Sequence, residues 1–178
     1  MLFRSDTFTV ATPGPGSMGH LTLELLNRQA AIKLRHIPYK GAAPGLADLI
    51  GGQVNFMFDN ISPAKPNILS GRTRAIAVAS LKRTPALPDV TTFHESGLAN
   101  FESASWFGYY APTGTPRAII DLLNREINAI VATTELKELY VRDAYDASPM
   151  TPAEQDQFLR VQVDKWTRVV REAGIKLE

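Results

Sequence analysis

The sequence predicts an α/β protein built on a parallel β-sheet. Short apolar runs suited to strands end at Ala11, Ile37 and Phe58, and helix-forming segments separate them at about residues 20–28 and 42–50. Strand–helix–strand is the repeating unit of a parallel sheet. Because open α/β sheets bind ligands at the carboxyl ends of their strands, the segments that follow these three strands are the first candidates for a site.

The first predicted strand, residues 8–11, leads into a loop at residues 12–19 that is rich in glycine and proline. Such a loop allows backbone N–H groups to converge on an anion, and the amino terminus of the following helix adds about half a positive charge. The loop therefore fits a carboxylate or phosphate. The alternative is a connector whose glycines only permit a tight turn.

The glycines of this loop also match a nucleotide-binding fingerprint. Gly14, Gly16 and Gly19 have the Gly-x-Gly-x-x-Gly spacing, whereas Gly-x-x-x-x-Gly-Lys-Ser/Thr does not occur. A dinucleotide site also needs an acidic residue at the end of the second strand. Residues 38–40 after Ile37 are Pro-Tyr-Lys, so the sequence argues against a dinucleotide site.

The second predicted strand cannot continue through Pro38 in a central position, because proline has no N–H for the sheet. A helix is expected at residues 42–50, with two glycines after it as a stop. The loop between strand and helix contains Tyr39, Lys40 and Gly41. Lys40 is either a solvated loop charge or a ligand contact, and Gly41 could donate its N–H to a ligand.

The third predicted strand, residues 54–58, is an apolar run suited to burial on both faces. Asp59 and Asn60 end it. Asp59 has two open interpretations: it accepts hydrogen bonds from a ligand amine, hydroxyl or ordered water in a cleft, or it caps the turn or helix that follows.

The remaining segments are expected to serve mainly architecture. In chain order they are a helix at about 62–70, a strand at 74–79, an irregular connection at 81–104, a strand at 105–111 and two helices. The first of these helices would open at Thr115, as a capping hydroxyl, with Pro116 as its first residue. The second would open with a capping box formed by Thr151 and Glu154.

Composition narrows the functional classes. The 178 residues carry 19 basic and 18 acidic side chains, a formal charge of +1, which gives no argument for nucleic acid or a charged membrane surface. With no cysteine, the chain has no disulfide and no thiol nucleophile. Its three histidines lack metal-like neighbours at helical spacing, so no metal and no cofactor is expected. No apolar run is long enough to cross a membrane, and residues 1–10 lack the features of a signal peptide.

A set of motifs runs along nearly the whole chain, from about Thr7 onward. The motifs are HIPYKG at 36–41, DLIGGQV at 48–54, MFDN at 57–60, GRTRAIAV at 71–78, KRTPALPDV at 82–90, SWFG at 105–108, APTGTP at 111–116, Trp166 and VVREAGI at 169–175. Together they resemble the Bug family of extracytoplasmic solute receptors associated with tripartite tricarboxylate transporters.

The resemblance implies a type II periplasmic-binding-protein fold of two α/β lobes with a ligand cleft between them. On this basis, residues 7–104 form the complete second lobe and residues 105–178 form the mostly helical C-terminal return segment of the first lobe. The rest of the first lobe, with its own ligand loop, has no counterpart here. The chain is therefore expected to be N-terminally truncated, with residues 1–5 as a start that replaces the true upstream region.

The resemblance also implies a function without catalysis: capture of a small organic carboxylate, either a dicarboxylate, an acidic amino acid or an aromatic acid. Backbone N–H groups and ordered waters hold the carboxylate in this family. The residues expected to contact ligand are Thr12, Gly14, Gly16, Ser17, His20, Tyr39, Lys40, Gly41 and Asp59. His20 is alternatively a capping residue. Met18 and Gly19 replace the small hydroxyl residues that the family usually has before His-Leu.

Further expectations follow from the same resemblance. The complete protein would be periplasmic and monomeric, would not bind nucleic acid, and would deliver its ligand to membrane transporter subunits. Two other classes stay open: the effector-sensing domain of a regulator, which would need a DNA-binding segment upstream, and a small α/β enzyme acting on a carboxylate, which would need an acid/base pair.

Overall fold

The computed structural model describes residues 5–175. The expectation that residues 1–5 are an artefactual start lies almost entirely outside the described part. The chain forms two compact units: unit 1 comprises Met1–Ser105 with Trp166–Glu178, and unit 2 comprises Trp106–Lys165. Each unit is described by itself below.

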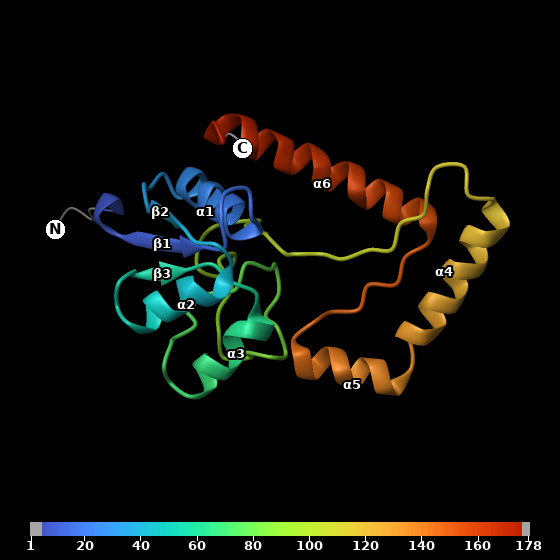
Figure 1. Ribbon diagram of the computed structural model, residues 1–178, viewed down its shortest axis with the longest axis horizontal. Coiled ribbons are helices and arrows are strands. Elements are labelled where there is room, and N and C mark those ends of the chain that lie inside the picture. Colours follow the sequence, from blue (N-terminus) through green and yellow to red (C-terminus); the bar gives the residue numbers. More distant parts are fainter. Residues whose placement is uncertain (1–4, 176–178) are drawn as a thin grey trace. The chain divides into compact units, whose positions relative to one another are not determined.

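A parallel sheet in the order β2-β1-β3 organises unit 1 (Figure 1). Its strands are β1 (Thr9–Thr12), β2 (Arg35–Pro38) and β3 (Phe56–Met57). β1 pairs with β2 from Thr9 opposite Arg35 to Thr12 opposite Pro38. Proline can end β2 because β2 is an edge strand, where a missing N–H costs little. The predicted parallel α/β arrangement is confirmed.

Two helices cover opposite faces of this sheet. α1 (Met18–Gln29) begins against the face that carries Thr12, because a Cβ built on Gly19 would lie 3.4 Å from Cβ of Thr12. α2 (Ala42–Ile50) packs on the other face, where Gly45 lies against Ala11. Since successive side chains of a strand point to opposite faces, β1 is buried on both sides.

The third strand is shorter than expected. The sequence predicts a strand at 54–58 buried on both faces, but β3 contains only Phe56 and Met57, both half-buried. The side chain of Asn55 replaces backbone pairing before β3: its Oδ1 accepts from the Thr9 N–H at 2.9 Å, and its own N–H donates to the Thr9 hydroxyl at 3.1 Å. After β3, α3 (Ile61–Leu69) follows where a helix is expected.

Two other expected strands do not form. Within 74–79, only Val78 makes a bridge, a parallel one to Thr92. Residues 105–111 have no strand partner among the described residues, and Phe107 and Tyr109 are more than 80% exposed. Both segments have strand-like composition, but a strand also needs a neighbouring strand, and among the described residues 74–79 has only the single bridge and 105–111 has no pairing.

The core of unit 1 forms between α1, the irregular connection and the end of the last helix. Leu25 and Leu26 of α1 pack with Phe101 and Val169, and Phe93 contacts the Phe101 ring at 4.6 Å between centroids. An ion pair joins Arg28 and Glu172 within the same unit. This core holds α1 in place and therefore fixes the position of its amino terminus.

Unit 2 is helical. It contains α4 (Arg117–Val131), α5 (Thr134–Asp143) and the beginning of α6 (Pro152–Ala173), which ends in unit 1. The predicted capping box is confirmed, since Thr151 N–H donates to Glu154 and Glu154 N–H donates to the Thr151 hydroxyl. The predicted cap of α4 is wrong: the Thr115 hydroxyl donates to the Pro112 carbonyl, and Pro116 precedes the helix as its cap position.

None of the helices in the described part of the chain is both long and apolar enough to cross a membrane.

Candidate functional site

The carboxyl ends of the three strands bring together the loops that the sequence singles out. The Tyr39 N–H donates to the Thr12 carbonyl at 3.0 Å, and the Gly41 N–H donates to the Pro13 carbonyl at 3.0 Å. On the other side, the Phe58 N–H donates to the Ala11 carbonyl at 3.3 Å. The segments 12–19, 38–41 and 58–60 therefore meet at one edge of the sheet.

The loop after β1 uses most of its own N–H groups inside the protein. The Gly14 N–H donates to the Thr12 hydroxyl at 3.4 Å, the Gly16 N–H donates to Nδ1 of His20 at 3.1 Å, and the Ser17 N–H donates to the Gly14 carbonyl. The sequence-based expectation that these loop amides converge on an anion is therefore not met in this structure. Gly16 adopts a φ of 71°, which favours glycine.

The first turn of α1 supplies the available backbone donors instead. Ser17 caps this helix, and its hydroxyl accepts from the His20 N–H at 3.3 Å. The N–H groups of Met18 and Gly19 donate no hydrogen bond within the described part of the chain. Unpaired first-turn amides carry the positive end of the helix dipole, so they suit an anion such as a carboxylate.

Two histidines lie beside this turn. The rings of His20 and His36 stack with 3.9 Å between centroids and 14° between planes. Nε2 of His36 lies 2.6 Å from the Thr12 hydroxyl, and Nε2 of His20 lies 3.9 Å from a carboxylate oxygen of Glu24. Burial lowers the pKa of both rings; for His36, burial and the neighbouring His20 bring the pKa to about 4. The lowered pKa values favour the neutral form of both rings at pH 7.

The loop after β2 places its three candidate residues differently. The Tyr39 hydroxyl donates to Oδ2 of Asp48 on α2 at 2.7 Å, and this bond raises the Tyr39 pKa. Lys40 is exposed. The Gly41 N–H, suggested by the sequence as a donor to ligand, is donated to Pro13 instead.

Asp59 follows β3, and only one of its two carboxylate oxygens has a hydrogen bond among the described residues. Its Oδ1 accepts from the Asn60 N–H at 2.8 Å, whereas its Oδ2 is buried and has no hydrogen-bond partner among residues 5–175. Burial raises the pKa of this carboxyl group. Asp59 does not cap α3, because Asn60 occupies the cap position of this helix. Its bond to the Asn60 N–H is compatible with a cap of the turn before α3. The ligand contact and the turn cap both remain predictions.

Three residues that position the site were not among the predicted contacts. His36 holds the Thr12 hydroxyl, Asp48 holds the Tyr39 hydroxyl, and Gly19 allows α1 to approach β3, since a Cβ there would lie 3.1 Å from the Phe58 carbonyl oxygen. The third glycine of the Gly-x-Gly-x-x-Gly spacing was a usable signal for that close approach. No sequence spacing indicates the other two pairs.

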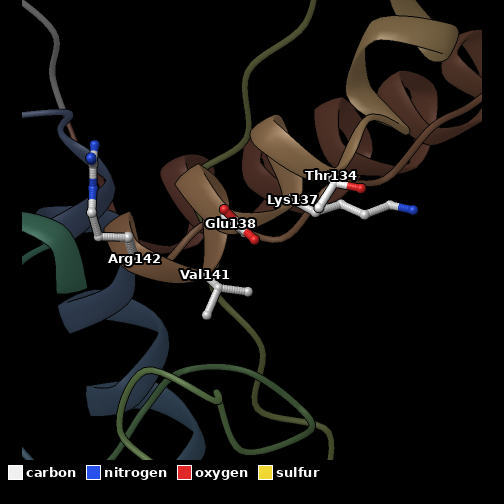
Figure 2. Close-up of a pocket in the computed structure, with 5 residues that line it drawn as sticks. All are labelled: Thr134, Lys137, Glu138, Val141 and Arg142. Carbon is white, nitrogen blue, oxygen red and sulfur yellow. The ribbon is translucent and has the colours of Figure 1, made fainter.

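The described residues contain no group of three or more His, Cys, Asp or Glu side chains that could hold a metal ion. A shallow depression in unit 2 is lined by residues of α5 alone (Figure 2): Thr134, Lys137, Glu138, Val141 and Arg142. It contains none of the predicted contact residues and is mostly open.

The fold and this edge define the class of protein: a parallel α/β unit whose three strand-end loops meet beside the amino terminus of a helix. The chain belongs to the tripartite tricarboxylate transporter family receptors, whose family model matches residues 4–175. This confirms the resemblance to the Bug and related receptors that the motifs indicate.

Similar proteins agree with this assignment. Protein BugT of Bordetella pertussis is 37% identical over 165 residues, covering 92% of this chain and 50% of BugT. An R. palustris protein solved with adipate has a TM-score of 0.81 at 31% identity, covering 94% of this chain and 56% of that one. MatC from Rhodopseudomonas palustris, solved with bound malate, has a TM-score of 0.72 at 29% identity, covering 94% and 58%.

These comparisons confirm the predicted periplasmic-binding-protein-like α/β class. The chain spans about half the length of BugT and of several other curated relatives that it matches. Proteins of this family are receptors rather than enzymes, and similar solved structures include the periplasmic binding protein BugD. The division of the chain into lobes at residues 104 and 105 and the contact residues remain predictions.

Proposed function

We propose that this chain is the ligand-binding part of a periplasmic receptor that captures a small organic carboxylate for a tripartite tricarboxylate-type transporter. The observation that carries the proposal is the family match over residues 4–175. Because similar structures were solved with adipate and malate, a dicarboxylate is the favoured ligand among the classes that the sequence suggests. The complete protein would act as a monomer without a cofactor.

The free N–H groups of Met18 and Gly19 support a specific place for one carboxylate of the ligand. They lie at the amino terminus of α1, beside the stacked rings of His20 and His36, and the positive end of the helix dipole at this terminus favours an anion. Asp59 lies at the adjacent strand end and would select ligands that carry a hydrogen-bond donor. We place the other predicted contacts, Thr12 to Ser17 and Tyr39 to Gly41, around this anchor.

Transport would follow from lobe closure rather than from chemistry. In this proposal residues 7–104 form one lobe and residues 105–178 return to the other, and ligand binding stabilises a closed population that the membrane subunits recognise. A chain that spans half of its relatives would supply only one side of the cleft, so we expect weak binding by this chain alone.

The test is a titration of the ¹⁵N-labelled chain with malate, adipate, aspartate, citrate and benzoate, because NMR detects weak binding. We expect the Met18 and Gly19 amide signals to shift with a dicarboxylate and not with the uncharged diamide of adipate. If neither amide signal shifts with any of the carboxylates, the proposal is contradicted.

A matched pair of variants sharpens this test. Met18→Pro removes one free N–H at the first helical position, where proline is well tolerated, and Ser17 before it already has the extended ψ of 159° that a following proline requires. Met18→Ala removes the side chain and keeps the N–H. We expect Met18→Pro to weaken carboxylate binding more than Met18→Ala does, with both variants folded by circular dichroism.

A further inference from the structure

The contact between His20 and Gly16 fixes the protonation state of a residue beside the proposed anchor. A backbone N–H can only donate, so Nδ1 of His20, at 3.1 Å from the Gly16 nitrogen, must be an unprotonated acceptor. The ring proton is then on Nε2. If the ring became an imidazolium, Nδ1 would carry a proton that faces the Gly16 N–H, and this hydrogen bond would be lost.

The ring of His36 is also expected to be neutral. His36 stacks on His20 with 3.9 Å between centroids, so two imidazolium rings would repel each other at close range. His36 also contacts the fully buried Thr12 hydroxyl at 2.6 Å. Thr12 and Gly16 lie on either side of Gly14, so the two rings together hold both ends of the loop that leads into α1.

Among the described residues, few charged or polar groups face the rings of His20 and His36. On α1, the half-buried Glu24 lies 3.9 Å from Nε2 of His20, beyond hydrogen-bond distance. From β1, the facing group is the uncharged Thr12 hydroxyl, and from β2 it is His36 itself. Burial of the two rings acts in the same direction as the geometry, since it lowers the pKa of each.

We propose that His20 and His36 are positioning residues that hold the loop between Thr12 and Ser17, and with it the free amides of Met18 and Gly19, only while both rings are neutral. Protonation of the pair breaks the Gly16 bond and lowers affinity for a carboxylate. The second statement rests on the proposed function, whereas the first concerns the ligand-free protein. Acidification thus releases ligand through the loop, although it also adds positive charge near the anion.

Four variants distinguish the effect of the hydrogen bond from the effect of the aromatic ring. His20→Asn retains an acceptor oxygen at the position of Nδ1 and cannot titrate. His20→Phe retains the ring and loses the acceptor. His36→Gln retains a polar nitrogen or oxygen for Thr12 and cannot titrate. His94→Asn is the matched control, because Nδ1 of His94 also accepts a backbone N–H, that of Asn100 at 3.1 Å, outside the site.

The first measurement is the hydrogen-exchange protection of the Gly16 amide in the ligand-free chain between pH 4 and 8, corrected for intrinsic exchange. We expect protection to fall in acid in the wild type and in the His94→Asn control, to be low at every pH in His20→Phe, and to be independent of pH in His20→Asn. Equal protection in His20→Phe and the wild type, in chains folded by circular dichroism, would overturn the proposal.

The second measurement is malate or adipate affinity over the same pH range. The ligand also takes up protons in this pH range, and this affects every variant alike. We therefore expect the wild-type affinity to fall in acid by about three- to tenfold more than the affinities of His20→Asn and His36→Gln, the equivalent of one hydrogen bond. An affinity that rises in acid would overturn the proposed link to ligand. If no carboxylate binds any form at any pH, the proposed function fails, and Gly16 protection still decides whether the histidines position the loop.

Discussion

The hydroxyl oxygen of Thr12 lies 2.6 Å from Nε2 of His36, and this contact joins the end of β1 to β2 by side chains. Val10 is opposite His36 in the sheet, and Thr12 lies two residues after Val10 on the same face of β1. The side chains of Thr12 and His36 therefore share the face that α1 covers. Thr12 is fully buried. A polar side chain in this position is explained by its partner, because burying a hydroxyl without a hydrogen bond is unfavourable.

Replacing Thr12 by valine keeps the shape and removes this hydrogen bond, together with the longer one that the hydroxyl accepts from the Gly14 N–H at 3.4 Å. We expect Thr12→Val to lower the free energy of unfolding by about 1–2 kcal/mol, because Nε2 of His36 loses its buried partner. Urea denaturation followed by circular dichroism measures the change. In a His36→Phe background the same substitution should cost much less, and an equal cost in both backgrounds would show that the contact does not contribute.

The contribution of His36 to stability should fall as the pH falls from about 6.5 to about 4. The pKa of His36 is near 4 in the folded protein and 6.5 as its ordinary value, so the unfolded chain binds the proton more readily over this interval. The free energy of unfolding, measured at half-unit pH steps, should decrease less steeply in His36→Gln than in the wild type. Identical slopes would contradict the lowered pKa.

The comparison with His36→Gln matters because two carboxyl groups act in the opposite direction. Burial raises the pKa of Glu24 and of Asp59, so each contributes stability at low pH that is lost as the pH rises through its folded value. These contributions are present in both proteins and cancel in the difference.

The substitution Asp59→Asn should stabilise the protein most at high pH. Oδ2 of Asp59 is buried and has no hydrogen-bond partner in the described part of the chain. The neutral amide removes the cost of burying a charge, and its oxygen can still accept from the Asn60 N–H. We expect the stability of Asp59→Asn, relative to the wild type, to increase as the pH rises from 4 to 8. A difference that does not vary with pH would show that the carboxyl titrates normally.

Alanine should be tolerated in place of Gly45, whereas larger residues should destabilise the protein. A Cβ there would lie 3.2 Å from Cδ2 of Tyr39 and 3.4 Å from Cβ of Ala11. In Gly45→Ala, the gain in helix propensity of about 1 kcal/mol roughly offsets this tight contact. Gly45→Leu would push α2 away from the sheet, and we expect a loss of about 2–3 kcal/mol in urea denaturation.

A control for this prediction lies in the same region. A Cβ on Gly41 would have open space around it, but its φ of 104° strains any other residue. Gly41→Ala and Gly41→Leu should therefore destabilise by similar amounts, in contrast with the size dependence at Gly45. Equal costs for alanine and leucine at Gly45 would exclude close packing of α2 as the cause.

Local periodicity and turn residues were sufficient to predict much of unit 1. The helix expected at 42–50 forms as α2 with those bounds, and the three strand-end loops meet at one edge, because parallel strands must end on the same side. Helix periodicity and glycine stops depend on residues close in the sequence, so the sequence alone specifies them. The motifs were also sufficient to indicate the family.

Pairing and hydrogen-bond partners were decided by the tertiary structure. The segments 74–79 and 105–111 have strand-like residues but lack a partner strand, and the side chain of Asn55 shortens β3. His36 contacts Thr12 across 24 positions and His20 across 16, and the N–H groups of Gly16 and Gly41 are donated inside the protein. Such contacts join residues far apart in sequence or compete for the same donor, so only the folded chain determines which amides are left for a ligand.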